Sequence, residues 1–331
     1  MKRALGLLGA VAAAVTVSAC DKAHPQTTLN PQGPISQKLQ NLFNPVFWIA
    51  VFVFVLVEGL IVFAAIKYRR RSDDDRPVQV HGNTKLEMTW TILPALTLAV
   101  VGFFTVKTVF DISRIPKNAM TIEVTGHRWW WEYDYTQYNI KTATELHIPS
   151  GVPVVLNLTS ADVIHNFWPP ALAGKLYAIP GRHNKLVLQA SHPGTFYGQC
   201  AEYCGLSHAN MRLRVIAQPM AEFQAWVQSQ QAPPAAPAAG TDAAAGLSLF
   251  QQRGCAGCHT INGISAGSVG PNLTHLESRS VFAGGIFALT PNNLRTWLRN
   301  PPKAKPGSVM PNLNLSEEDI TSLIAYLGTL K

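Results

Sequence analysis

Two long apolar runs constrain the fold of this chain more than any other feature. They cover residues 45–66 and 90–110, and about 20 residues in a helix are enough to cross about 30 Å of hydrocarbon. The segment between the runs is basic and carries Lys67, Arg69, Arg70, Arg71, Arg76 and Lys85. Because such basic loops stay in the cytoplasm, the pattern predicts a transmembrane hairpin, with both flanking parts of the chain on the outer side.

The first residues have the form of a secretion signal, which agrees with this topology. Lys2 and Arg3 precede an apolar segment at residues 4–17, and small residues follow it. The residues up to Cys20 resemble the lipobox of bacterial lipoproteins. This resemblance implies that residues 1–19 are a signal peptide and that Cys20 is a lipidated mature N-terminus in a bacterial inner membrane. The alternative is an ordinary signal peptide followed by an incidental cysteine.

The net charge of +8 over 331 residues does not indicate nucleic-acid binding. Outside the cluster between the two apolar runs, basic residues are scattered, and no basic stripe is interleaved with aromatic residues. Glu58 lies within the first apolar run. A carboxylate at that depth is costly unless it faces protein or water, so we expect a contact with another membrane subunit or with a partner helix.

Beyond the second apolar run, the pattern changes to that of short strands. The β-rich runs are residues 121–124, 152–158, 185–188 and 211–216. They predict a β-sandwich or a small barrel. Residues 231–245 are rich in alanine and proline and are expected to form a linker. The remainder, residues 246–331, has helical spacing, and Ser316 followed by three acidic residues predicts a helix start.

Two cysteines, a histidine and a methionine lie close together near the end of the strand-rich region. They are Cys200, Cys204, His208 and Met211. Soft sulfur ligands together with imidazole favour copper. Zinc is the alternative because it also takes cysteine and histidine, but the thioether argues against it. His165, on the turn after a predicted strand, is expected to complete two coppers that share both thiolates.

The sequence Cys-Ala-Gly-Cys-His that begins at Cys255 is the pattern of covalent haem c attachment. Cys255 and Cys258 are expected to bind the haem vinyl groups, with His259 as the proximal iron ligand. A redox-active or zinc-binding pair is the alternative, which the histidine and the outer location disfavour. Met310 is the only methionine after the motif and is the expected sixth ligand, with His275 as the alternative. A thioether ligand raises the haem potential.

The strand-rich region and the apolar runs resemble cytochrome c oxidase subunit II with its copper A domain. The resemblance covers nearly all of residues 35–230 and includes segments 89–94, 126–131, 145–149 and 178–182. The loop around Met310 and the segment 270–273 resemble class I cytochromes c. The implied fold is multi-domain, with a two-helix transmembrane hairpin at 40–115, a cupredoxin-like β-sandwich at 116–230 and an all-α cytochrome c domain at 246–331.

The resemblance also assigns roles to individual residues. It implies that Cys200 and Cys204 bridge two coppers, and that His165 and Met211 bind one while His208 and the Glu202 carbonyl oxygen bind the other. The Glu202 carboxylate is expected to reach a magnesium ion shared with subunit I. Trp129 is expected to be exposed and to receive electrons from cytochrome c. Glu87 is expected to mark the mouth of a proton channel in subunit I, the alternative being a solvated interfacial glutamate.

The implied function is electron transfer within a proton-translocating cytochrome c oxidase of the respiratory chain. A donor such as a cytochrome c or a quinol:cytochrome c reductase would reduce haem c, and electrons would pass through copper A to subunit I, where oxygen is reduced to water. Subunit I and further oxidase subunits are the expected partners. The alternatives are a copper A-containing nitric oxide reductase, a quinol oxidase subunit, whose relatives lose the copper ligands, and a lipid-anchored copper carrier.

Overall fold

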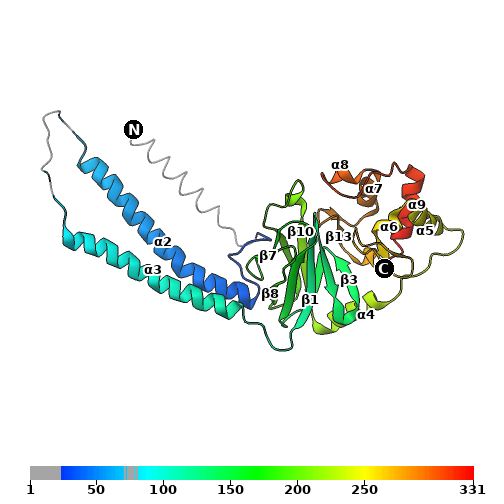
Figure 1. The fold of residues 1–331 in the computed structure, drawn as a ribbon, viewed down its shortest axis with the longest axis horizontal. Helices are drawn as coiled ribbons and strands as arrows, with labels where there is room; N and C mark the ends of the chain where they lie inside the picture. The colour runs from blue at the N-terminus through cyan, green and yellow to red at the C-terminus, as the bar shows by residue number, and fades with distance from the viewer. Residues whose placement is uncertain (1–23, 71, 73–78, 80) are drawn as a thin grey trace. The chain divides into compact units, whose positions relative to one another are not determined.

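The computed structural model describes residues 24–70, 72, 79 and 81–331 (Figure 1). The predicted signal peptide, Cys20, Arg71 and Arg76 lie outside these residues. The chain divides into two compact units, one formed by residues 37–114 and the other by the described residues before and after them.

The predicted hairpin is present as two long helices, α2 (Pro34–Lys67) and α3 (Thr84–Ile112). Both are long and apolar enough to cross a membrane, and their most apolar stretches are not buried within the chain. Each helix extends beyond the apolar run that predicted it. Glu58 is exposed on α2, so a partner for this carboxylate would come from outside the hairpin.

The strand-rich region forms a sandwich of two five-stranded sheets (Figure 1). One sheet has the order β3-β2-β1-β5-β8 and the other the order β4-β10-β9-β6-β7. The strands are β1 (Met120–His127), β2 (Trp130–Tyr135), β3 (Ile140–Ala143), β4 (Glu145–Pro149), β5 (Val154–Ser160), β6 (His165–Trp168), β7 (Leu176–Ala178), β8 (Asn184–Leu188), β9 (Gly194–Cys200) and β10 (Arg212–Gln218). The four predicted β-rich runs overlap β1, β5, β8 and β10.

Buried and partly exposed side chains alternate along β2, and the buried ones fill the space between the sheets. Trp131, Tyr133 and Tyr135 are fully buried, while the residues between them are partly exposed. The Tyr135 hydroxyl donates to the carbonyl oxygen of His147 and accepts from its backbone nitrogen, both at 2.8 Å. Because β2 and β4 belong to different sheets, this side chain ties the two layers together.

The C-terminal part is helical, as predicted, with two short hairpins added. Its elements are α5 (Asp242–Gln252), α6 (Cys255–Cys258), β11 (Thr260–Ile261), β12 (Ser265–Ala266), β13 (Val281–Phe282), β14 (Phe287–Ala288), α7 (Pro291–Arg299), α8 (Pro301–Ala304) and α9 (Glu317–Leu327). Ser316 caps α9 in a reciprocal capping box with Asp319. The rings of Phe250 and Tyr326 meet at 5.9 Å where α5 and α9 cross.

The segment expected to be a linker is shorter than the composition indicates. Helix α4 (Met220–Gln231) ends at the first residue of that segment, and α5 begins at Asp242, inside it. Thr241 accepts a hydrogen bond from the backbone nitrogen of Ala244 and so caps α5. The alanines after Asp242 favour helix as well as linker, which explains why composition alone misplaced the boundary.

Candidate metal and haem centres

The structure brings the predicted sulfur and imidazole side chains together in one buried cluster. The sulfur atoms of Cys200 and Cys204 lie 3.8 Å apart. His165 Nδ1 lies 3.9 Å from the Cys200 sulfur. On the other side, His208 Nδ1 lies 3.5 Å and the Met211 sulfur 3.9 Å from the Cys204 sulfur. These side chains therefore surround one small volume, as a dinuclear site requires.

Strand ends and one loop position this cluster. Cys200 ends β9, and the loop that follows returns to the start of β10 through the short helix η2 (His208–Asn210). The loop is closed by a hydrogen bond from Cys200 N to Met211 O, 2.9 Å long. The carbonyl oxygen of Glu202 accepts from the Cys200 thiol at 3.3 Å, so this backbone oxygen adjoins the cluster.

Asp162 is a member of the site that the sequence reasoning missed. Its Oδ1 lies 2.8 Å from Nε2 of His165. With Nε2 engaged by the carboxylate, Nδ1 faces the Cys200 sulfur, which is how outer carboxylates orient metal-binding histidines. Burial alone would raise the pKa of Asp162, but hydrogen bonds from His165 and from the backbone lower it to about 2. The three-residue spacing between Asp162 and His165 was the available signal.

The two cysteines shift each other's pKa because they are so close together. The hydrogen bond from Cys204 is the largest cause that lowers the pKa of Cys200, and the same contact raises the pKa of Cys204. Burial opposes protonation of His165, yet hydrogen bonds with Asp162 and Cys200 outweigh it and raise its pKa.

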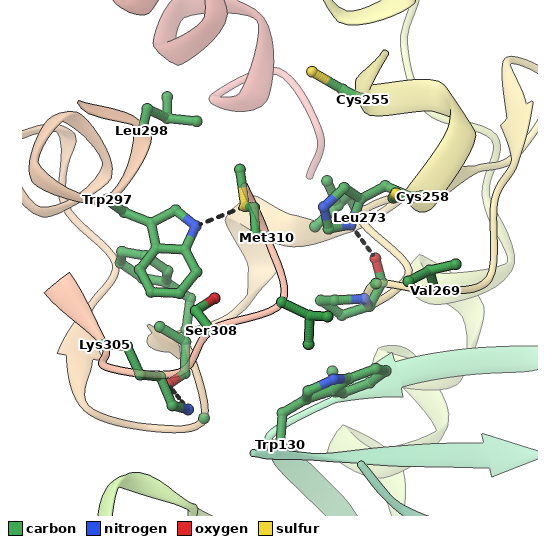
Figure 2. A pocket seen from close by; sticks show the side chains of 18 of the residues that line it. Trp130, Cys255, Cys258, Val269, Leu273, Trp297, Leu298, Lys305, Ser308 and Met310 are labelled. Atoms are coloured by element: carbon green, nitrogen blue, oxygen red, sulfur yellow. Dashed lines mark hydrogen bonds between the residues drawn. The ribbon is translucent and has the colours of Figure 1, made fainter. Parts of the chain in front are cut away.

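The Cys-Ala-Gly-Cys-His motif opens onto a separate cavity, shown in Figure 2. Cys255, Cys258, His259 and Met310 all line this cavity, and most of the other lining side chains are apolar. His259 Nδ1 lies 2.8 Å from the Pro271 carbonyl oxygen, in the segment that resembles class I cytochromes c. Burial lowers the pKa of His259, which favours the neutral imidazole that metals bind.

Met310 and its alternative, His275, occupy different places. The Met310 sulfur lies within the cavity and accepts a hydrogen bond of 3.2 Å from Trp297 Nε1 (Figure 2). His275 does not line the cavity, and its Nδ1 lies 2.6 Å from the carbonyl oxygen of Lys331. The side-chain positions therefore favour Met310 as the residue that could face the haem iron.

Trp129 is not exposed as expected. Only 6% of its surface is accessible, because the C-terminal part of the chain covers it. Its Nε1 donates to the carbonyl oxygen of Cys204 at 3.1 Å, and its side of the sandwich also lines the haem cavity. The expectation was wrong because it assumed a free surface for a soluble donor, whereas residues of this chain occupy that surface.

Glu87 lies in the first turn of α3 and has a local structural role. Its carboxylate accepts from the backbone nitrogen of Asn83 at 3.2 Å, while the Asn83 side chain accepts from Leu86 N. These two contacts satisfy backbone donors at the helix start. The glutamate is exposed.

Three family models match the chain. They are the transmembrane domain of cytochrome c oxidase subunit II at residues 26–108, its periplasmic domain at residues 139–218 and cytochrome c at residues 243–331. The chain is 39% identical to cytochrome c oxidase subunit 2 of Alkalihalophilus pseudofirmus, over 92% of this chain and 91% of that protein. This chain belongs to the cytochrome c oxidase subunit 2 family.

Other members of the family differ in how much of the chain they match. Cytochrome c oxidase subunit 2 of Bacillus sp. (strain PS3) is 34% identical over 80% of each protein. Quinol oxidase subunit 2 of Bacillus cereus is 32% identical over 64% of this chain and 75% of that protein. Membership confirms the predicted fold class and the prediction that the chain is a subunit of an oxidoreductase. The periplasmic and cytochrome c family domains imply copper A and haem.

Proposed function

We propose that this chain is the subunit through which electrons enter a haem–copper oxidase. A donor reduces the haem of the C-terminal part, and electrons then pass through copper A to subunit I, where oxygen is reduced to water. One observation carries the proposal: Trp129 lines the haem cavity and also donates a hydrogen bond to Cys204 of the sulfur cluster. A single buried side chain therefore connects the two candidate centres.

The sulfur cluster fits a copper pair better than zinc. Cys200, Cys204 and His165 offer ligand atoms that lie within 4.8 Å of one another, and all three residues are buried. Met211 is fully buried beside them; its thioether suits copper, for which it is a common weak ligand. On binding a copper pair, Cys200 and Cys204 would act as thiolates and release their protons.

The cavity beside α6 fits a haem attached to Cys255 and Cys258. Its apolar lining suits a porphyrin, and the Nδ1 contact of His259 leaves Nε2 for the iron. Arg279 lines the same cavity, and its Nε has no hydrogen-bond partner within the described part of the chain. Burial lowers the pKa of Arg279 to about 10, so it remains a cation that a haem carboxylate would complement.

When bound, the two groups supply one-electron oxidation and reduction without making or breaking bonds. The residues of the chain then have three tasks. The strands and the loop fix the donor atoms of the copper ligands before metal binds, which limits geometric change. The buried position of Cys200, Cys204 and His165 excludes water and leaves no room for a substrate. The C-terminal part of the chain stays tethered, which replaces a bimolecular encounter with an intramolecular one.

Several finer assignments belong to the same proposal. We infer one covalent haem c with His259 and Met310 as axial ligands, and a copper A pair bound by His165, Cys200, Cys204, His208, Met211 and the Glu202 carbonyl. The Glu202 carboxylate would reach a magnesium ion at subunit I, and Glu87 the mouth of a proton channel. Cys20 would carry a lipid. The basic residues Lys67, Arg69 and Arg70 at the end of α2 support a cytoplasmic turn and soluble domains on the periplasmic side.

Co-purification with the membrane partners, followed by metal analysis and turnover, tests the function. We expect a haem c α-band, the multiline hyperfine signal of a mixed-valence copper pair, and oxygen consumption with a reduced cytochrome as donor. Zinc in place of copper would contradict the copper assignment. Turnover of nitric oxide without oxygen consumption would identify a reductase, and direct oxidation of quinol with no electron transfer through haem c would identify a quinol oxidase.

A further inference from the structure

The segment after α8 makes short polar contacts with the sandwich. The Lys305 amine donates to the carbonyl oxygen of Trp129 at 2.6 Å and to that of Ala283 at 2.7 Å. We call residues 201–211, between β9 and β10, the sulfur loop. Next to Lys305, the Ser207 hydroxyl of this loop donates to Pro306 O at 2.5 Å. The loop that carries two of the sulfur ligands and the segment that precedes Met310 are thus joined directly.

The Trp129 ring lies against glycines from both parts of the chain. A Cβ atom added to Gly307 would lie 2.5 Å from the ring atom Cη2 of Trp129. One added to Gly205 of the sulfur loop would lie 3.1 Å from Cζ2. Real Cβ atoms do not approach other atoms as closely as 2.5 Å. The backbone at Gly307 is therefore in close contact with the indole, and only glycine leaves room for it.

Lys305 is buried, which is costly for a lysine unless its donors are satisfied. Only 3% of its surface is accessible. Burial lowers its pKa to about 7, and the amine has enough hydrogens to make both contacts in either charge state. Its two acceptors in the described structure are backbone carbonyls, one from each side of the contact. The side chain therefore bonds across the contact, and its neighbour Lys303 is exposed.

Further polar contacts join the same two parts of the chain. The carboxylate of Glu145, on the buried strand β4, accepts from the backbone nitrogen of Ser280 at 3.0 Å and from its hydroxyl. The backbone nitrogen of Arg212 also donates to Gly284 O at 2.8 Å. These contacts also hold the C-terminal part against the sandwich. Lys305 and Gly307 lie against Trp129 itself.

We propose that Lys305 is a latch that holds the haem-bearing part over Trp129, so that Trp129 takes electrons from this chain's own haem and is closed to a soluble cytochrome. In that step, a bound haem would give up one electron and a bound copper pair would accept it, with no proton or bond transferred. A soluble donor would then have to dock on the haem-bearing part. Lys305 lines the haem cavity, but its amine bonds to the carbonyl oxygens of Trp129 and Ala283 and to no proposed ligand side chain, so its role here is that of a positioning residue. This inference rests on the proposed function.

The test compares Lys305→Met with Lys303→Met in the complete oxidase. Hydrogen–deuterium exchange of peptides containing Trp129 and Ser207 reports the contact without any turnover. Loss of a buried donor shifts the equilibrium between the covered and the open contact by about tenfold. We therefore expect exchange about tenfold faster than in wild type for Lys305→Met, and an unchanged exchange rate for Lys303→Met. The haem-to-copper step should slow by a similar factor, while added soluble ferrocytochrome c should gain direct access to copper. Unchanged exchange in Lys305→Met would overturn the latch.

Gly307→Ala provides a second, independent variant. Gly307 has a φ of +83° and Gly263 a φ of +77°, but a Cβ at Gly263 meets nothing within 4 Å. Gly307→Ala and Gly263→Ala therefore share the backbone strain, and only the first pushes against Trp129. We expect faster exchange at Trp129 and a slower haem-to-copper step in Gly307→Ala alone. Equal behaviour of the two would reject the contact.

The two proposals fail in different ways. If the purified wild-type complex shows no haem c band or no copper-pair signal, the proposed function is wrong. If both signals are present in wild type and in Lys305→Met, and neither exchange nor electron transfer changes, the latch is wrong and the function stands. Lys305→Arg keeps a donor at this position. Exchange and electron-transfer rates close to wild type in this variant would support a hydrogen-bonding role.

Discussion

The indole nitrogen of Trp129 donates a hydrogen bond to the carbonyl oxygen of Cys204, 3.1 Å away and shielded from water. This contact joins an aromatic residue between β1 and β2 to the loop that bears the candidate copper ligands. Through this bond, the side chain of the covered tryptophan is fixed to the backbone of the sulfur loop. Replacing the indole tests whether this bond matters to the fold of the site.

Trp129→Phe keeps an aromatic ring and removes the donor. An acceptor left without its partner in a buried place costs about 1–3 kcal/mol, so we expect the free energy of unfolding to fall by about that amount. The copper hyperfine pattern should also change, because the affected carbonyl belongs to Cys204. Denaturant unfolding followed by copper absorbance measures the first effect, and electron paramagnetic resonance the second. Wild-type values for both would show that the bond is dispensable.

Two buried tyrosines of β2 offer a matched pair of variants. The Tyr135 hydroxyl makes two hydrogen bonds with His147, whereas the buried Tyr133 hydroxyl has no partner among the described residues. Loss of a satisfied buried group costs about 1–3 kcal/mol. Tyr135→Phe should therefore lower the free energy of unfolding by that amount, and Tyr133→Phe should leave it unchanged or raise it. Equal losses in the two variants would contradict the role of Tyr135 in joining the sheets.

Met310→Leu tests the sixth haem ligand. The substitution keeps an apolar side chain of similar size in the cavity and removes the thioether sulfur. We expect loss of the weak sulfur–iron absorption at the red end of the spectrum and a lower haem potential, since a thioether ligand raises it. His275→Ala serves as the control, because His275 bonds to Lys331 O outside the cavity. Loss of the absorption in the control instead would move the assignment to His275.

Local patterns made the hairpin predictable, and they also pointed to the residues of both candidate ligand sets. The apolar runs follow from length and composition, and the spacing of Cys255, Cys258 and His259 is the pattern that covalent haem attachment requires. Some strands escaped prediction because their residues do not look like strand formers. Gly198 in β9 is one case: a Cβ there would lie 2.5 Å from Trp168 O, so a glycine in mid-strand reflects a close backbone approach and not a turn.

The cover over Trp129 could not be predicted in this way. Lys305 and Trp129 are 176 residues apart in the chain, and a lone lysine after a short helix carries no local signal of burial. The resemblance to the family even favoured an exposed tryptophan. Only the packing of one part of the chain against another fixes which surface a donor can reach.

Gly246 is the residue on which the crossing of α5 and α9 depends. A Cβ atom added there would lie 2.0 Å from Ser322 O and 2.7 Å from Cβ of Tyr326, so the two helices touch through backbone. Helix propensity alone predicts that Gly246→Ala stabilises α5 by about 1 kcal/mol. Overpacking a close contact costs about 1–3 kcal/mol, and here the backbone of α9 cannot move without displacing the Phe250–Tyr326 pair. We therefore expect a net loss of stability and a lower thermal midpoint for the haem absorbance, with the copper signal retained. A raised midpoint would show that the helices separate without cost, and the sign of the change decides between the two effects.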